Sequence, residues 1–172
     1  ELGQNKRTSE THGILGRIYK GQAEAEQKAG NMEAADGAMN EAIKSYEDGF
    51  RLDPRDYYPG VNAVTLRLRR GTEEDLKEMA TLVPVVRFSV NRAPVPQYEM
   101  ERYWQQATKL ELACAERDWN GAQSLLSDVL AIHAQDWMRE TTIKNLRLQE
   151  QAFSKDSTAV TNLVQIINKL IP

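Results

Sequence analysis

Three basic side chains are the residues of this sequence best suited to hold an anion. Arg17 and Lys20 stand three positions apart in one segment, and Arg69 lies in another. A guanidinium group binds phosphate or carboxylate through two parallel hydrogen bonds, whereas an ammonium group acts as a point charge. These residues therefore indicate a site for a charged ligand. The alternatives are that Arg17 pairs with Glu10 or covers the surface, and that Lys20 is solvated.

Aromatic and amide side chains could complete such a site. Tyr58 and Trp104 have flat faces on which a nucleobase can stack, a contact worth about 1–3 kcal/mol per base in single-stranded nucleic acids. Asn62 and Thr108 could bind a ribose or a base edge, and Asn62 could equally hold a peptide backbone. The structural alternatives are that Tyr58 closes a helix start and that Trp104 packs in the core. Trp119 is assigned to packing.

Residues for catalysis or metal binding form no pattern in this sequence. The two histidines, His12 and His133, are far apart and lack cysteine companions, so no metal site is predicted. No glycine-rich phosphate loop, nucleophile elbow or helical His-Glu-x-x-His motif occurs. We therefore expect a protein that is not an enzyme and needs no cofactor.

The composition is that of an ordinary globular protein, with 41% hydrophobic and 27% charged residues. The net charge of -3 argues against a nucleic-acid partner, which needs a concentrated basic surface, and no apolar run is long enough to span a membrane. Cys114 has no disulfide partner, which indicates a buried thiol in a reducing, cytoplasmic protein. We expect one domain over residues 1–172, and because Glu1 is not preceded by Met, we expect it to be part of a longer protein.

Apolar residues recur at helical spacing between the glycines and prolines, which predicts an all-α fold. Helices are expected at about residues 7–28, 32–52, 59–70, 73–91, 97–117, 120–133, 137–153 and 158–169. Pro84 should kink or interrupt the fourth of these. Asp136 and Ser157 are expected to cap the last two. The short loops predict about four antiparallel pairs.

One segment has small and aromatic residues at a recognisable spacing. Ala42, Tyr46 and Gly49 follow one another in the second expected helix, Pro54 comes just after its end, and Leu15-Gly16-Arg17-Ile18-Tyr19 lies in the first. They resemble the two helices of a tetratricopeptide repeat, in which a small residue on one helix lets a large one on its neighbour approach closely. Extra residues between the two halves predict helices longer than usual. The sequence therefore predicts a tetratricopeptide-like helical solenoid.

A longer set of motifs points to one family. It comprises Glu10-Thr11-His12-Gly13-Ile14-Leu15-Gly16-Arg17-Ile18-Tyr19-Lys20, Tyr57-Tyr58-Pro59-Gly60-Val61-Asn62 and, further on, Tyr103-Trp104 and Trp137. The set resembles the tetratricopeptide region in the central regulatory part of apoptosis signal-regulating kinases, called their TRAF-binding region, and its bacterial relatives. The resemblance covers nearly the whole chain. For the bacterial relatives it implies a sensor of a nucleotide-derived signal, linked to defence effectors.

The resemblance also implies where ligands bind, because the first helix of each pair lines the concave surface of such solenoids. With Gly16 as the packing residue, residues three or four apart share the inward face. The candidate ligand-binding residues are then Arg17, Lys20, Tyr58, Asn62, Thr65, Arg69, Trp104, Thr108, Trp137 and Thr141. The same stripes contain Glu10, Gly13, Glu111 and either Lys144 or Asn145.

These observations predict a non-catalytic sensor domain. Its concave groove would bind an NAD-related or cyclic nucleotide signal and regulate an attached effector in defence or stress signalling. The alternative is a protein-interaction scaffold whose groove takes a peptide or a partner helix. A third possibility is a spacer or dimerisation element that forms a homo-oligomer.

Overall fold

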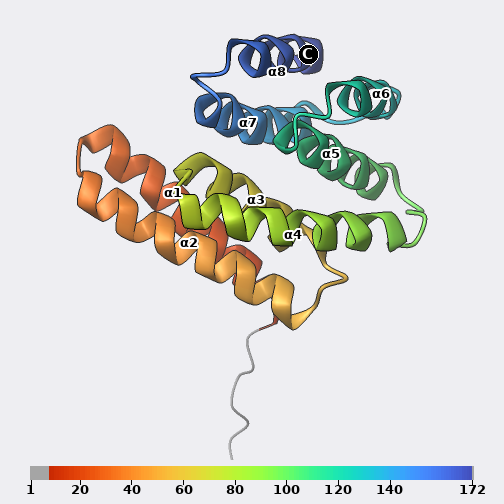
Figure 1. Cartoon of the computed structure of the whole chain (residues 1–172). Helices are drawn as coiled ribbons and strands as arrows, with labels where there is room; N and C mark the ends of the chain where they lie inside the picture. The colour runs from red at the N-terminus through yellow and green to blue at the C-terminus, as the bar shows by residue number, and fades with distance from the viewer. Residues whose placement is uncertain (1–7, 172) are drawn as a thin grey trace, which may run out of the picture.

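Eight helices make up residues 8–171, the part of the chain that this computed structural model describes. They are α1 (Ser9–Ala29), α2 (Met32–Leu52), α3 (Tyr57–Arg70), α4 (Glu73–Arg92), α5 (Glu99–Ala115), α6 (Trp119–Leu130), α7 (Asp136–Ala152) and α8 (Ser157–Leu170) (Figure 1). The all-α prediction is confirmed, and the expected helices agree with these bounds to within a few residues. Arg7, where the first helix was expected to begin, lies outside the described residues.

Several helix starts differ from those expected by one or two residues, and three of them involve a carboxylate at or next to the start. Asp56 accepts a hydrogen bond from the backbone nitrogen of Tyr58, so α3 begins at Tyr57 rather than at Pro59. Asp156 caps α8, and Ser157 is already its first residue. The predicted cap of α7 was also wrong, since Asp136 is the first helical residue. A carboxylate close to a helix start fits either position, because it satisfies free backbone N–H groups and opposes the helix dipole.

The helices pack as antiparallel pairs, in the manner of a helical-repeat solenoid. In the first pair, α1 and α2 have 21 residues each, as the long separation of the repeat halves predicted. A Cβ atom added at Gly16 would lie 2.7 Å from the ring of Tyr46, and one added at Gly60 would lie 2.7 Å from Val86. Such glycines are where helix backbones come closest, which confirms Gly16 as the packing residue of its repeat.

The solenoid winds tightly enough for non-neighbouring pairs to touch. Helices α1, α3, α5 and α7 line its inner side, and α3 packs against α7 as well as against α1 and α5 (Figure 1). In an extended solenoid each repeat contacts only the next one. The contact between α3 and α7 therefore closes the deeper part of the inner face.

Helix α4 continues through Pro84 without interruption. The proline ring removes one backbone donor and leaves the carbonyl group of Ala80 without its helical partner. Both residues are exposed, so water can satisfy that carbonyl group. The prediction of an interruption was therefore wrong.

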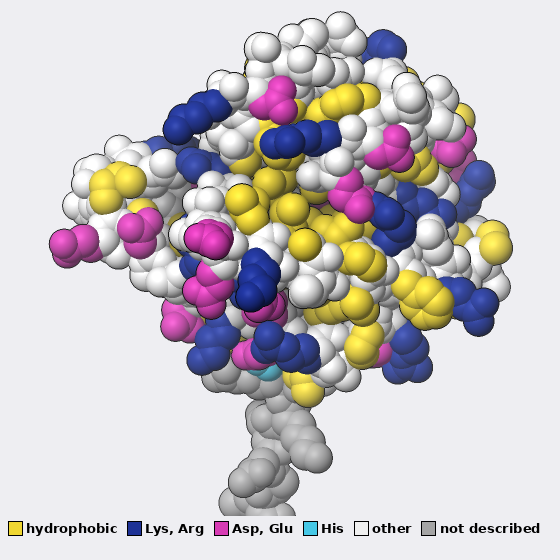
Figure 2. Space-filling view, viewed as in Figure 1, with side chains coloured by type: hydrophobic (Ala, Val, Ile, Leu, Met, Phe, Trp, Pro, Cys, Tyr) yellow, Lys and Arg dark blue, Asp and Glu magenta, His cyan; other side chains and the backbone are white. Residues whose placement is uncertain are grey.

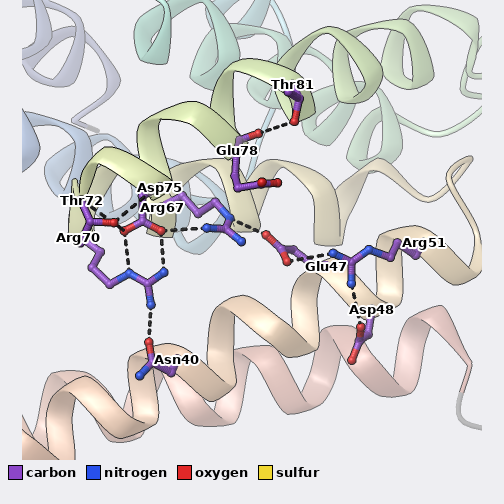
Figure 3. Close-up of polar contacts among 10 residues, drawn as sticks. All are labelled: Asn40, Glu47, Asp48, Arg51, Arg67, Arg70, Thr72, Asp75, Glu78 and Thr81. Carbon is purple, nitrogen blue, oxygen red and sulfur yellow. Dashed lines mark hydrogen bonds and ion pairs between the residues drawn. The ribbon is translucent and has the colours of Figure 1, made fainter.

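A network of charged side chains joins α2, α3 and α4 (Figure 3). Asp75, buried at the start of α4, accepts hydrogen bonds from Arg67, Arg70 and its own capping residue Thr72. Burial would raise the pKa of Asp75, but the hydrogen bonds from Arg70 and Thr72 outweigh it and lower the pKa to about 2. Arg67 also binds Glu47 of α2. The network holds α4 in place on the outer side of the solenoid.

The apolar core runs through the pairs from α2 to α8. Cys114 is fully buried within it, and burial raises the pKa of its thiol, with the charge of Glu111 adding to the effect. Trp119 packs against the same core from the start of α6. Both residues are therefore packing residues, as expected.

Candidate binding site on the inner face

The four inner helices bring their N-terminal halves to one end of the inner face. A Cβ atom added at Gly13 of α1 would lie 3.2 Å from the ring of Tyr58 of α3. Helix α3 packs against α5, and the neighbouring Tyr57 is partly buried against the core. This burial raises the pKa of Tyr57, with the negative charges of Asp56 and of Glu101 on α5 adding to the rise. The rings of Trp104 and Trp137 join α5 to α7, with centroids 5.8 Å apart. These contacts form one level across all four helices.

This level carries an aromatic rim, which we define as Arg17, Tyr58, Trp104 and Trp137. Tyr58 is 44% exposed and Trp137 49% exposed, while Trp104 is half-buried against the core. Thr141, one turn after Trp137, is exposed and donates a hydrogen bond to the carbonyl group of that residue. The rim thus presents aromatic surface to solvent from three separate helices.

Arg17 and Tyr58 share one hollow of the rim. The hollow has a volume of about 180 Å³ and is lined by both side chains together with Gly13, Asp56 and Glu10. The ring of Tyr58 also meets the buried Tyr46 edge-on, with centroids 6.1 Å apart. The packing of Tyr58 against Tyr46 holds its ring beside the exposed guanidinium group of Arg17.

Deeper on the inner face lies a polar layer, which we define as Lys20, Thr65, Glu111, Asn145 and Gln149. Thr65, Glu111 and Asn145 stand about two helical turns beyond the rim residue of their own helix, and Lys20 reaches the layer from less than one turn after Arg17. Lys20 Nζ donates to Asn145 Oδ1 at 2.7 Å, and Asn145 Nδ2 donates to both carboxylate oxygens of Glu111 at 3.2 and 3.3 Å. Gln149 Nε2 donates to the carbonyl oxygen of Glu111 at 3.0 Å. The side chain of Asn145 therefore bridges an ammonium group of α1 and a carboxylate of α5.

Burial dominates the electrostatics of this layer. It raises the pKa of the Glu111 carboxyl to about 7, against the hydrogen bond from Asn145 and the positive charge of Lys20, which both lower it. Burial also lowers the pKa of Lys20, against the attraction of Glu111. A charge removed from water is costly unless it is paired and hydrogen-bonded. The Asn145 bridge supplies part of that compensation for both groups.

Three other polar residues predicted for the groove, Asn62, Thr65 and Thr108, are also buried. Thr65 is fully buried and its Oγ1 has no hydrogen-bond partner, as is also true of Gln149 Oε1. Asn62 is buried and donates to the backbone carbonyl of Tyr58 in its own helix. Thr108 is 6% exposed. At this depth, side chains from several helices fill the inner face.

The ten predicted residues therefore share the inner helices but do not share one open groove. The structure brings Arg17 together with Tyr58 and Trp104 together with Trp137, and it leaves these four at the rim. Lys20 binds Asn145 in the polar layer, and Arg69 Nε donates to Gln151 Oε1 at 2.9 Å near the far end of α7. The basic side chains are thus spread along the face. Ligand contact by any of the ten stays a prediction.

Gln149 was not predicted from the sequence, and Asn145 was one of two alternatives with Lys144. Glu111 carries the clearest available signal, a single acid within the apolar run from Leu110 to Ala115. Asn145 and Gln149 stand one turn apart on α7, which is the spacing of two residues that face the same neighbour. That neighbour is α5, and its place beside α7 is a property of the fold.

The geometry defines a class of protein, a helical-repeat array with an exposed aromatic rim on its inner helices. Comparison with protein families then places the array: the model of the MAP3K TRAFs-binding domain matches residues 2–168. The chain belongs to this family, as the sequence motifs indicated. No curated protein and no solved structure matches the chain. Within residues 8–171, no helix is both long enough and apolar enough to cross a membrane.

Proposed function

We propose that this chain is a non-catalytic protein-interaction module whose aromatic rim receives a segment of a partner protein. The observation that carries the proposal is that Tyr58, Trp104 and Trp137 converge on the rim and remain at least partly exposed. Tyr, Trp and Arg are the residues that contribute most to binding energy at protein interfaces. The family description, a TRAFs-binding domain, supports a protein as the partner.

Because side chains fill the deeper part of the inner face, a partner segment docks more easily at the rim than along the whole concave surface. A peptide lying along the whole concave surface would have to displace Asn145 from Lys20 and Glu111. Displacement would leave both charges without their bridge, a cost of several kcal/mol. The rim requires no such rearrangement, since its rings already face solvent. A short segment with one or two apolar anchor residues fits this surface best.

Titration with a TRAF protein tests the proposal, because the family description names TRAFs as partners. Tryptophan fluorescence reports directly, since Trp104 and Trp137 belong to the rim. We expect saturable binding that Trp137→Ala weakens by at least tenfold, with Arg55→Ala as the control because the Arg55 side chain is 91% exposed and its ion pair is with Asp53. If no TRAF protein binds, photo-crosslinking from position 58 in cells that make the protein searches for the partner. Absence of any protein adduct at that position would overturn the proposal.

A second candidate is the sensor of a nucleotide-derived signal, which regulates an attached effector. The shared hollow of Arg17 and Tyr58 favours it, because a cation beside an aromatic ring suits a phosphate next to a base. With about 180 Å³, the hollow is smaller than the roughly 300–1,000 Å³ of most small-molecule sites. It would therefore hold one end of such a ligand. Calorimetry with NAD-derived and cyclic nucleotides decides: heat that disappears in Arg17→Ala supports the sensor, and no heat with any nucleotide rejects it.

A further inference from the structure

The outward face of α4 exposes hydrophobic side chains along its middle. On that face Phe88 is 67% exposed and Val85 49%, and along one flank of the helix Leu76 (45%), Ala80 and Pro84 are exposed as well. Figure 2 shows hydrophobic side chains gathered over α4 on the side seen in Figure 1. Contiguous apolar surface of this kind marks a contact with another molecule.

Two hollows flank α4, so its outward residues form a ridge between them. On one flank, Leu76, Ala80 and Pro84 line a hollow of about 490 Å³ that extends to Phe153 at the end of α7. On the other flank, Leu82 and Val85 line a hollow of about 520 Å³ that extends to Phe50 of α2. A ridge bordered by apolar hollows matches the shape of another such ridge, because each ridge can enter a hollow of the other.

The charges on α4 are divided between its two ends. The first half holds the exposed Glu73, Glu74 and Glu78 with one base, Lys77, and is therefore net acidic. The exposed Arg92 ends the helix, with its guanidinium group 6.0 Å from the centre of the Phe88 ring, while Arg87 is already paired with Glu116. Glu74 and Arg92 stand nine residues before and after the buried Val83. Nine residues are about two and a half turns, so both side chains point away from the buried side of the helix. The outward stripe is thus acidic at one end, apolar in the middle and basic at the other end.

We propose that a second copy of this chain docks on the outward face of α4, with the two α4 helices antiparallel about a two-fold axis beside Val83. Antiparallel pairing around this point sets Glu74 of each copy opposite Arg92 of the other, so the contact forms twice. The apolar middle of each stripe then meets the apolar middle of the other. A parallel arrangement would instead set like charges opposite each other.

The same axis accounts for the exposure of Phe88. Its side chain lies about 140° round the helix from Val83, on the same flank as Ala80 and Pro84. The two-fold rotation carries Phe88 over Leu76 and Ala80 of the second copy, where the hollow of about 490 Å³ can receive the ring. The inference goes beyond the proposed function, because α4 lies on the outer side of the solenoid and the aromatic rim lies on the inner helices.

Sedimentation velocity of the 172-residue chain, over about 1 to 500 μM, tests the dimer because weak protein contacts dissociate in this range. We expect a monomer–dimer equilibrium that Phe88→Ala weakens by at least tenfold. Ile18→Ala is the matched control, an exposed apolar side chain on α1, and should leave the equilibrium unchanged. A chain that stays monomeric throughout, or a dimer unaffected by Phe88→Ala, would overturn the proposal.

A charge exchange tests the antiparallel geometry. Glu74→Arg alone and Arg92→Glu alone each set like charges opposite each other twice, so we expect each to weaken the dimer by about tenfold or more. The double variant restores opposite charges and should recover most of the affinity. Circular dichroism confirms that each variant is folded. Failure of the double variant to recover would rule out this axis. The outcome is independent of the rim, where partner binding is read from Trp137→Ala.

Discussion

The aromatic rim and the polar layer lie on the same four helices at successive depths, and they differ in what surrounds their side chains. At the rim, Tyr58 and Trp137 are about half exposed, whereas Glu111 and Gln149 of the polar layer are almost or fully buried. The layer lies where α3 and α7 touch, and Lys20 reaches it from α1. The inner face is therefore open at the level of the rim and sealed at the level of the polar layer.

How tightly the repeats wind decides whether a polar residue on the inner face is free for a ligand or buried in a network. An asparagine or lysine on the inner face of an open solenoid is free for a ligand, but here Asn145 and Lys20 bind each other. A fully hydrogen-bonded buried network favours one arrangement of the helices over others, because any slip leaves charges unpaired. We infer that the polar layer stabilises the curvature that presents the rim.

Removing the bridge of the polar layer should have the largest effect. Asn145→Ala leaves Lys20 and Glu111 without their hydrogen bonds, and we expect the free energy of unfolding to fall by about 4 kcal/mol. Urea denaturation followed by circular dichroism measures it. The matched control is Thr141→Ala, one turn earlier on the exposed side of α7, which should change stability by less than about 0.5 kcal/mol. Equal effects of the two variants would contradict the division between rim and layer.

The pH dependence of stability isolates Glu111. Its pKa is raised to about 7 in the folded state, so the folded chain holds this proton more tightly than the unfolded chain does. Stability from this group is complete below about pH 4.5 and is lost as the pH rises to 7, a fall of about 3 kcal/mol. Glu111→Gln has no such proton, so its stability should not show this fall. Urea denaturation at several pH values compares the two, with the exposed Glu140→Gln as control; parallel curves for wild type and Glu111→Gln would refute the assignment.

The rim should show the opposite behaviour, a loss of binding without a loss of stability. Trp137→Ala removes a half-exposed ring, so we expect stability to change by less than about 1 kcal/mol and partner affinity to fall by about 2 kcal/mol, or roughly thirtyfold. Thermal unfolding and fluorescence titration of the same variant separate the two quantities. A variant that unfolds much more readily than wild type would show that Trp137 serves the core instead.

The sequence predicted the helices and their pairing well, because both depend on local signals. The small Gly16 and the aromatic Tyr46 that packs against it are read directly from residue types and spacing. The starts of α7 and α8 were shifted by one residue, since an Asp beside a helix start fits either the cap or the first helical position.

Exposure on the inner face could not be predicted in the same way. The spacing of Lys20, Thr65 and Arg69 places them on the inner side of their helices, but it does not show how tightly the repeats wind. The contact of α3 with α7 joins residues far apart in the chain, and it depends on the sum of small rotations between successive pairs. Periodicity therefore identified the inner face but did not distinguish the rim from the layer.

Thr65 gives the finest test of that distinction, because it was predicted to contact a ligand and its Oγ1 is buried without a partner. An unpaired buried hydroxyl costs stability, and Val replaces it with a methyl group of nearly the same shape. We expect Thr65→Val to raise the free energy of unfolding by about 1 kcal/mol, measured by urea denaturation, and to leave partner binding at the rim unchanged. Thr142→Val is the matched control, since Thr142 Oγ1 accepts a hydrogen bond from Tyr103 at 3.0 Å and its loss should destabilise the fold. If Thr65→Val instead abolished ligand binding at unchanged stability, the inner face would open in solution to reach Thr65, and the sealed layer would have to be reinterpreted as a second binding level.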